Sequence, residues 1–242
     1  MVYGLRMVRL EDSEQPPAPG GRRRNGVELA VFLFLIVPSM LLSFTVTRGG
    51  GMDFVTAALA TIVRDLGLVG LIAYFLWRNG EAFECLGWIR RGAGREIVLG
   101  AILFVPLFLG TGWLARLLQS VGLSGPPAAI PAFLQAHGLL QMLLALALVS
   151  VVAVAEETIF RGYLILRLRM LGLERLSAAV VSSLLFSLGH GYEGSAGVIT
   201  VGVMGLAFAW VYLWRGSLIA PIVMHFLQDL VGLVILPALG GH

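Results

Sequence analysis

The sequence has no lysine, a single cysteine and few charged residues of either sign. Charged residues are 13% of its 242 residues and hydrophobic residues are 58%, whereas a soluble domain has about 25% charged residues. With a mean hydropathy of +0.90, this composition argues against a water-soluble globule and indicates an integral membrane protein. The single cysteine, Cys85, excludes an internal disulfide and a metal site built from several cysteines.

The first 26 residues are polar, contain three prolines and end just after Arg22–Arg24. No apolar segment precedes these arginines, and no small-residue cleavage site follows such a segment, so we expect no cleaved signal peptide. The composition predicts a disordered cytoplasmic tail over residues 1–26. A single transmembrane helical domain is then expected over residues 27–236.

Seven apolar stretches follow this tail, and most have about the 20 residues that a membrane-spanning helix needs. They predict an all-α fold, a polytopic transmembrane helix bundle of about seven spans, with six to eight as the range. The fifth stretch is the shortest, and the fourth is long enough to project from the bilayer. The stretches are Val27–Thr47, Phe54–Trp77, Ile97–Leu118, Leu139–Leu166, Leu176–His190, Val198–Trp214 and Leu218–Leu236. Gly191–Gly197 is expected to form a turn.

All 17 basic residues are arginine, and most lie between the apolar stretches instead of forming one basic patch. This distribution argues against a nucleic-acid partner. Arginine-rich loops lie on the cytoplasmic side of a membrane, so their alternation predicts a cytoplasmic N-terminus. The arginine-rich segments are residues 22–24, 78–95, 167–175 and 215. Within the second stretch, Arg64-Asp65 predicts either a local ion pair or a division into two shorter helices.

Two adjacent carboxylates, Glu156 and Glu157, end the most apolar run of the chain. Each intramembrane charge costs about 2.5–3.5 kcal/mol on insertion scales, so such a residue is a functional-site hypothesis by default. On an α-helix Glu157 faces Arg161, four residues later, which predicts an ion pair and leaves Glu156 available for another partner. The same spacing places Phe186 with His190, and His225 with Asp229.

A carboxylate and two imidazoles that meet inside a membrane suit the activation of water. A desolvated glutamate is well matched to accept a proton from water near neutral pH, and a histidine can orient that water or relay its proton. The second histidine, with Asp229, could stabilise the oxyanion that forms when water attacks an amide carbonyl. The predicted reaction is hydrolysis of a peptide bond by Glu156, His190 and His225.

Three motifs in this order resemble those of the CPBP family, which includes CAAX prenyl proteases of the Rce1 type and bacteriocin-processing or Abi-type proteases. The segment EETIFR (156–161) matches EExxxR, FSLGH (186–190) matches FxxxH, and HFLQD (225–229) matches HxxxN/D. The resemblance implies a helical membrane protease domain with its active site in a cavity within the bilayer. It also implies an intramembrane endopeptidase, a hydrolase that acts on peptide or membrane-protein substrates in the lipid bilayer of a bacterial-type plasma membrane.

The resemblance further implies a role for each motif residue. Glu156 and His190 would activate water, and His225 and Asp229 would serve the oxyanion. Asp229 stands where the eukaryotic prenyl proteases have asparagine, and a carboxylate cannot donate to an oxyanion unless it is protonated. Orientation of His225 is therefore the other role for Asp229. Glu157 and Arg161 would be structural or would support the reacting groups without touching the substrate. Phe186 would shape the pocket.

Three alternatives remain open from the sequence. Glu156, His190 and His225 could hold zinc, as in metalloproteases with two histidines and one glutamate; the sequence has no HExxH motif, and a metal-free reaction without a cofactor is expected. A proton-coupled transporter could use Glu156, Arg64 and Asp65 as a relay, although repeated halves are not visible. A non-catalytic membrane scaffold is the third. The sequence fixes neither the oligomeric state nor whether the substrate is prenylated.

Overall fold

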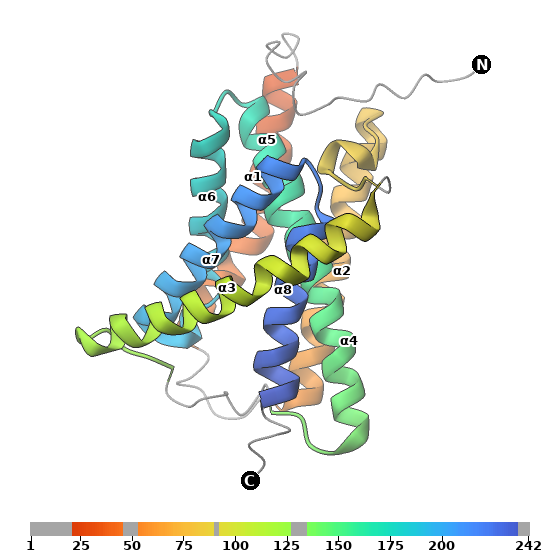
Figure 1. The fold of residues 1–242 in the computed structure, drawn as a ribbon. Coiled ribbons are helices and arrows are strands. Elements are labelled where there is room, and N and C mark those ends of the chain that lie inside the picture. The colour runs from red at the N-terminus through yellow and green to blue at the C-terminus, as the bar shows by residue number, and fades with distance from the viewer. Residues whose placement is uncertain (1–20, 46–52, 90–91, 127–134, 237–242) are drawn as a thin grey trace.

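A computed structural model describes residues 21–45, 53–89, 92–126 and 135–236, and the regular elements in these ranges are helices. Figure 1 shows how they are arranged. The elements η3 and η6 are 3₁₀ helices, and η5 and η7 are π-helices. In chain order they are α1 (Gly21–Leu42), α2 (Phe54–Asn79), η3 (Phe83–Leu86), α3 (Ala93–Ser120), α4 (Gly138–Glu156), η5 (Glu157–Leu164), α5 (Ile165–Met170), α6 (Arg175–Leu188), η6 (Gly191–Glu193), α7 (Gly194–Arg215), α8 (Ile219–Asp229) and η7 (Leu230–Ile235).

The described residues form seven continuous helical rods, because α4, η5 and α5 form one rod and α8 and η7 another. Five rods are long and apolar enough to span a membrane, and the other two, Arg175–Leu188 and Ile219–Ile235, are shorter apolar helices. The predicted all-α bundle of about seven spans is confirmed. The chain is an integral membrane protein.

Two predicted boundaries are wrong. The first helix begins at Gly21, so Arg22–Arg24 lie in its first turns and not in the predicted tail; residues 1–20 are outside the described residues. The predicted turn over Gly191–Gly197 is also too long, because α7 begins at Gly194. Gly194 has a φ of 76°, a left-handed conformation that only glycine adopts without strain, and it lets the chain reverse within a short segment.

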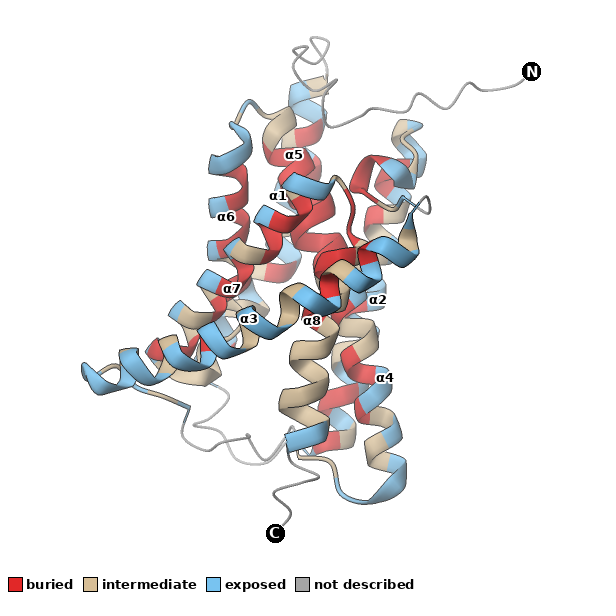
Figure 2. Cartoon of the chain, viewed as in Figure 1, coloured by how far each residue is buried: buried red, intermediate tan, exposed pale blue. Residues whose placement is uncertain are grey.

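The π-helix η5 lies at the centre of the bundle, and all eight of its residues are buried. The rods α1, α2, α6, α7 and α8 surround the α4–η5–α5 rod, and Figure 2 shows the buried residues concentrated around α5 and its neighbours. Small buried side chains on α6, Ala178, Ala179 and Ser182, let its backbone approach η5 closely, as small residues do between membrane helices. The aromatic ring of Phe32 on α1 packs 5.1 Å from that of Tyr163 on η5.

A buried charge network holds the arginine-rich end of this centre together. Arg167 on α5 is fully buried and donates to both carboxylate oxygens of Glu81, at 3.0 and 2.6 Å. It also lies 3.3 Å from Glu28 on α1, and Glu28 in turn pairs with Arg78 at the end of α2. Each buried charge therefore has an opposite charge within reach, as a low-dielectric interior requires, and α1, α2 and α5 are joined at one end.

The helix α3 crosses α8 at a large angle on the outside of the bundle and also contacts α7 (Figure 1). Its closest approach is at Gly100, where a Cβ atom would lie 2.7 Å from the carbonyl oxygen of Ala220 and 2.8 Å from Cβ of Val223. Glycine is therefore required where α3 packs on the start of α8. Most of the large side chains of α3 are exposed, among them Ile102, Leu109 and Trp113, which suits a helix that faces lipid.

Candidate active site

The two glutamates lie where the fourth span changes from an α-helix to a π-helix. Glu156 is the last residue of α4, and Glu157 is the first of η5. The α-helical geometry expected for residues 157–161 is therefore wrong, and a π-segment of this kind is often found at functional sites. Side-chain hydroxyls donate hydrogen bonds to backbone carbonyls at this change of helix type: Thr158 donates to Val154 O at 2.7 Å, and Ser182 donates to Phe160 O at 2.6 Å.

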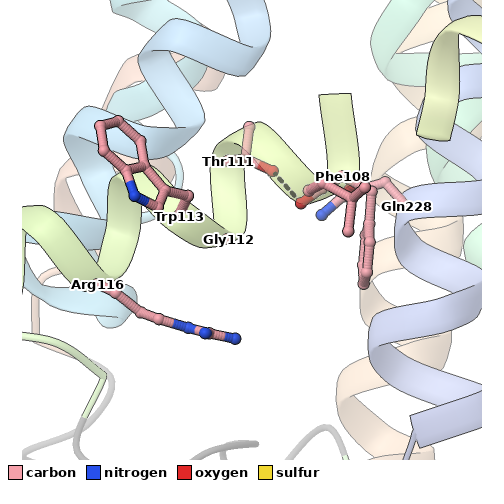
Figure 3. A pocket seen from close by; sticks show the side chains of 7 residues that line it. Phe108, Thr111, Gly112, Trp113, Arg116 and Gln228 are labelled. Carbon is pink, nitrogen blue, oxygen red and sulfur yellow. Dashed lines mark hydrogen bonds between the residues drawn. The ribbon is translucent and has the colours of Figure 1, made fainter. Parts of the chain in front are cut away.

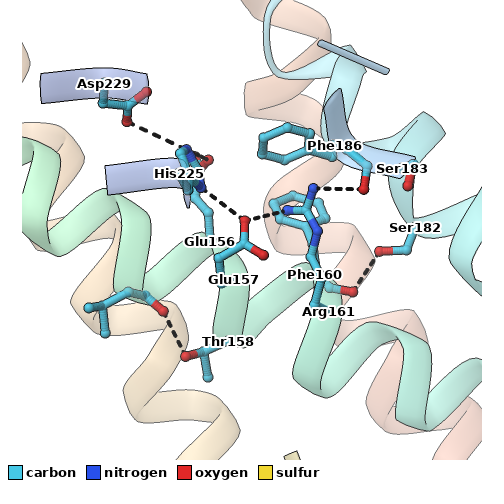
Figure 4. Close-up of polar contacts among 12 residues, drawn as sticks. Glu156, Glu157, Thr158, Phe160, Arg161, Ser182, Ser183, Phe186, His225 and Asp229 are labelled. Carbon is cyan, nitrogen blue, oxygen red and sulfur yellow. Dashed lines mark hydrogen bonds and ion pairs between the residues drawn. The ribbon is translucent and has the colours of Figure 1, made fainter. Parts of the chain in front are cut away.

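Glu157 lies between a cation and an imidazole, as Figure 4 shows. Its Oε1 accepts from Nη1 of Arg161 at 2.9 Å, which confirms the predicted pair. The same oxygen lies 2.9 Å from Nδ1 of His225. Arg161 also donates to the carbonyl oxygen of Gly205 at 3.2 Å and lies over the ring of Phe186 at 4.3 Å. Glu157 and Arg161 are buried, so these neighbouring groups, and not bulk water, compensate the charges of the pair.

The imidazole of His225 is fixed by Glu157 on one side and faces two carboxylates on the other. Because an ionised carboxylate only accepts hydrogen bonds, Nδ1 carries the proton toward Glu157, which sets the ring orientation. Nε2 then lies 3.4 Å from Oδ2 of Asp229 and 3.8 Å from Oε2 of Glu156. Asp229 therefore contacts His225, as predicted. The shorter contact, from Glu157 68 residues earlier in the chain, was not predicted from the sequence.

His190 lies in the turn after α6 and not on the fifth span, because α6 ends at Leu188. Its Nδ1 lies 3.2 Å from the carbonyl oxygen of Phe186, and the two rings are 5.0 Å apart. Phe186 also contacts the ring of His225 at 5.8 Å, so one buried phenyl ring contacts both imidazoles. The ring of Tyr192, in η6, lies tilted against the His190 ring, with the ring centres 6.0 Å apart. Within the described ranges no ion pair joins His190 to Glu156.

A serine just after the end of α1, Ser43, holds the backbone around His190, and the sequence analysis did not find it. The Ser43 hydroxyl has one hydrogen to share between Leu188 O at 2.9 Å and Met40 O at 2.6 Å, and it accepts from the N–H of Gly191 at 3.0 Å. A Cβ at Gly191 would lie 2.4 Å from the ring of Phe44. Ser43 therefore binds the chain on both sides of His190, which explains why a residue outside any helix keeps a defined place.

Replacing Ser43 by alanine is expected to loosen this turn, because Leu188 O and the Gly191 N–H would both lose a partner. We expect the amide of Gly191 to exchange its hydrogen at least about 10-fold faster, with a loss of about 1–2 kcal/mol in unfolding free energy. Hydrogen exchange read by mass spectrometry over the His190 segment measures the first effect. Ser39→Ala is the matched control, because Ser39 bonds only Ile36 O of its own helix; equal exchange in both variants would contradict the assignment.

The second span brings a further charged pair to Glu156. Helix α2 is continuous, so Arg64 and Asp65 form the predicted local ion pair at 2.8 Å and do not divide the span. Asp65 is 1% exposed, whereas Arg64 is 46% exposed. Nη2 of Arg64 lies 4.0 Å from Oε1 of Glu156. The motifs of the second half of the chain thus meet a cation from the first half.

Cys85 is not part of this site. It lies in η3, outside the spans, and is buried as a free thiol. Burial raises the pKa of this thiol to about 12, and a thiol with such a pKa is protonated at neutral pH and a poor nucleophile. Cys85 is therefore not a candidate nucleophile.

Among the described residues, the carboxylates and imidazoles around Glu156 do not form a metal-binding cluster. The part of the chain that the structure describes has no group of three or more His, Cys, Asp or Glu arranged to hold a metal ion. The ring nitrogens that face away from their hydrogen bonds, Nε2 of His190 and Nε2 of His225, are the atoms that a metal would use, with a Glu156 oxygen as the third ligand.

A cavity of about 270 Å³ lies elsewhere, between the second half of α3 and Gln228 of α8 (Figure 3). It is lined by Phe108, Leu109, Thr111, Gly112, Trp113, Arg116 and Gln228. None of the predicted site residues lines it, although Gln228 precedes Asp229 in the chain. The cavity is therefore separate from the cluster around Glu156.

Residues 138–231 match the family model described as type II CAAX prenyl endopeptidase Rce1-like. The match extends from the start of α4 into η7 and includes all three motifs. It confirms the resemblance to the CAAX protease family over this part of the chain. No curated protein and no solved structure shows a significant similarity to the chain.

Proposed function

We propose that this Rce1-like membrane protein is an intramembrane endopeptidase in which Glu156 activates the hydrolytic water. The observation that carries the proposal is the setting of the Glu156 carboxylate. It is 14% exposed at the end of an apolar helix, and its buried Oε2 has no hydrogen-bond partner in the part of the chain that the structure describes. A gap of 3.8 Å separates this oxygen from Nε2 of His225, and polar groups at such a distance are commonly bridged by water.

In the first step, water bound to Glu156 attacks the amide carbon. The water oxygen forms a bond to carbon, its proton moves to the Glu156 carboxylate, and the carbonyl π electrons move onto the oxygen as an oxyanion. His190 would orient this water from across Phe186. His225 would remain in place because Glu157 holds its Nδ1 and Arg161 holds Glu157.

In the second step, the C–N bond breaks and the leaving nitrogen takes the proton from Glu156. The glutamate returns to its ionised form, and the products are a carboxylic acid and an amine. Asp229, at 3.4 Å from Nε2 of His225, would hold that ring. The substrate is a peptide or membrane-protein segment that reaches the site from the bilayer, and the reaction needs no metal ion. We further place the N-terminus in the cytoplasm of a bacterial-type plasma membrane, from the arginine distribution.

Purified protein in lipid nanodiscs, mixed with a library of quenched fluorescent peptides, tests this function. We expect cleavage that survives exhaustive chelation and falls about 10²–10³-fold in His190→Ala, because general acid–base groups contribute about 10²–10⁴-fold. Loss of cleavage on chelation, restored by zinc, would support instead the metal alternative with Glu156, His190 and His225. Full activity of His190→Ala would contradict its role.

A further inference from the structure

The motif residues offer few donors for the oxyanion. The Asp229 carboxylate cannot donate a hydrogen bond unless it is protonated. Arg161 is a strong donor, but it is 1% exposed and is engaged by Glu157 and by Gly205 O. Nε2 of His225 already faces the carboxylates of Asp229 at 3.4 Å and Glu156 at 3.8 Å, so the negative charge that develops on the carbonyl oxygen calls for a further donor from another part of the fold.

We propose that Arg64 of α2 is this donor, a catalytic residue outside the three motifs; the proposal rests on the proposed hydrolysis by Glu156. Arg64 lies 4.0 Å from Oε1 of Glu156. This distance is too long for a hydrogen bond between them, and it places the guanidinium beside the carboxylate on which the attacking water would sit. A carbonyl oxygen one bond from the attacked carbon is then within reach of Arg64.

Asp65 holds the guanidinium in one orientation. Its Oδ1 accepts from Nε at 2.9 Å and lies 2.8 Å from Nη2, and Asp65 itself is 1% exposed. A guanidinium has five N–H donors, and Asp65 is reached through Nε and Nη2 only. With 46% of its side chain exposed, Arg64 can present other donors to a substrate. A donor fixed before the reaction stabilises a developing charge without reorganisation.

The charge balance of the reaction also favours Arg64. Before attack, the negative charge is on Glu156, next to Arg64. As the water proton moves to Glu156, this charge moves to the carbonyl oxygen. Arg64 thus faces one negative charge throughout the step, and only the position of that charge changes. The transition state can then be stabilised more than the ground state if the guanidinium is closer to the oxyanion than to Glu156, which is the condition for catalysis.

Arg64→Gln, Arg64→Lys and wild type, compared on one cleaved library peptide, test the proposal. We expect kcat to fall about 10²–10³-fold in Arg64→Gln with little change in KM, since loss of one oxyanion donor has this effect. Arg64→Lys should retain part of the rate, because it keeps the charge but loses the fork of donors. Arg116→Gln is the matched control, an arginine of α3 that lines the separate cavity, and should leave kcat unchanged.

A pH profile distinguishes this role from that of a counter-ion for Glu156. The groups that face Arg64 are Asp65, Glu156 and Tyr192. Loss of an oxyanion donor lowers kcat at every pH. Loss of a counter-ion shifts only the acid limb of the profile, so the rate of Arg64→Gln would then recover as the pH rises. Recovery, or a wild-type rate in Arg64→Gln, would overturn the proposal.

A phosphinic peptide with the sequence of the cleaved substrate gives a second readout that needs no turnover. Its tetrahedral anionic group resembles the intermediate, so it should bind about 10²-fold more weakly to Arg64→Gln than to wild type. Equal binding by folded protein would also overturn the assignment. Glu156→Gln separates this result from failure of the proposed function: an active Glu156→Gln enzyme refutes hydrolysis by Glu156, whatever the Arg64 variants do.

Discussion

Replacing Glu156 by glutamine is expected to lower kcat/KM for a cleaved peptide by at least about 10³-fold and to leave the folded protein as stable as the wild type. The amide has nearly the same shape but cannot accept the proton of water, and a general base contributes about 10²–10⁴-fold. Stability should be retained because Oε2 of Glu156 has no hydrogen-bond partner among the described residues, and the Arg64 guanidinium is 4.0 Å from Oε1, too far for a hydrogen bond. Cleavage kinetics and a thermal unfolding midpoint in the same detergent measure both effects.

The control for this experiment is Glu156→Asp, which keeps the carboxylate but shortens the side chain by one methylene. We expect it to retain more activity than Glu156→Gln, because it can still accept a proton. A glutamine variant that cleaves at the wild-type rate would rule out Glu156 as the base. An inactive but unfolded variant would show instead that Glu156 maintains the fold, contrary to the geometry.

Replacing the next residue, Glu157, by alanine is expected to cause a large loss of stability, in contrast to Glu156→Gln, which should stay stable. Glu157 is 0% exposed and is the carboxylate that pairs with Arg161 among the described residues. Breaking a buried ion pair by removing one partner costs about 3–5 kcal/mol, because the other charge stays buried without compensation. His225 would lose its Nδ1 acceptor as well. Unfolding in mixed micelles of a mild detergent and dodecyl sulfate gives the change in free energy.

A double-mutant cycle makes this prediction specific to the pair. Removing the charge of Arg161 together with Glu157, as Glu157→Ala with Arg161→Met, should cost less than the sum of the two single changes, since neither charge is then left alone. Additive losses would show that the two side chains do not stabilise each other. Arg78→Ala is a comparison for a half-exposed arginine, 42% exposed and paired with Glu28, and should cost less than Arg161→Met alone.

Local sequence was sufficient for the features that depend on near neighbours. The apolar stretches predicted the seven rods because a helix must satisfy its own backbone in lipid and needs a fixed number of apolar residues to cross it. The pair Glu157–Arg161 was predictable because residues four apart share a helix face, and it forms at 2.9 Å even though η5 is a π-helix. The motif segments also predicted the family that residues 138–231 match.

Local sequence was not sufficient for the site geometry. Hydropathy and α-helical periodicity do not report a π-helix, so the change of geometry at Glu157 could not be predicted. His190 was placed on the fifth span, whereas α6 ends at Leu188. The flanking residues Gly189 and Gly191 were a signal for that end, since glycine is often found where a helix stops.

The amino-acid sequence alone determined that the chain is a helical membrane protein and which side chains are the candidates for its chemistry, because hydrophobicity and residue type are local properties. Only the tertiary structure decided which of these side chains meet. It joined Glu157 to His225, placed Ser43 beside the turn of His190, and brought Arg64 to within 4.0 Å of Glu156. Such contacts depend on how the helices pack and rotate against one another, and that arrangement is set by the whole set of buried surfaces together.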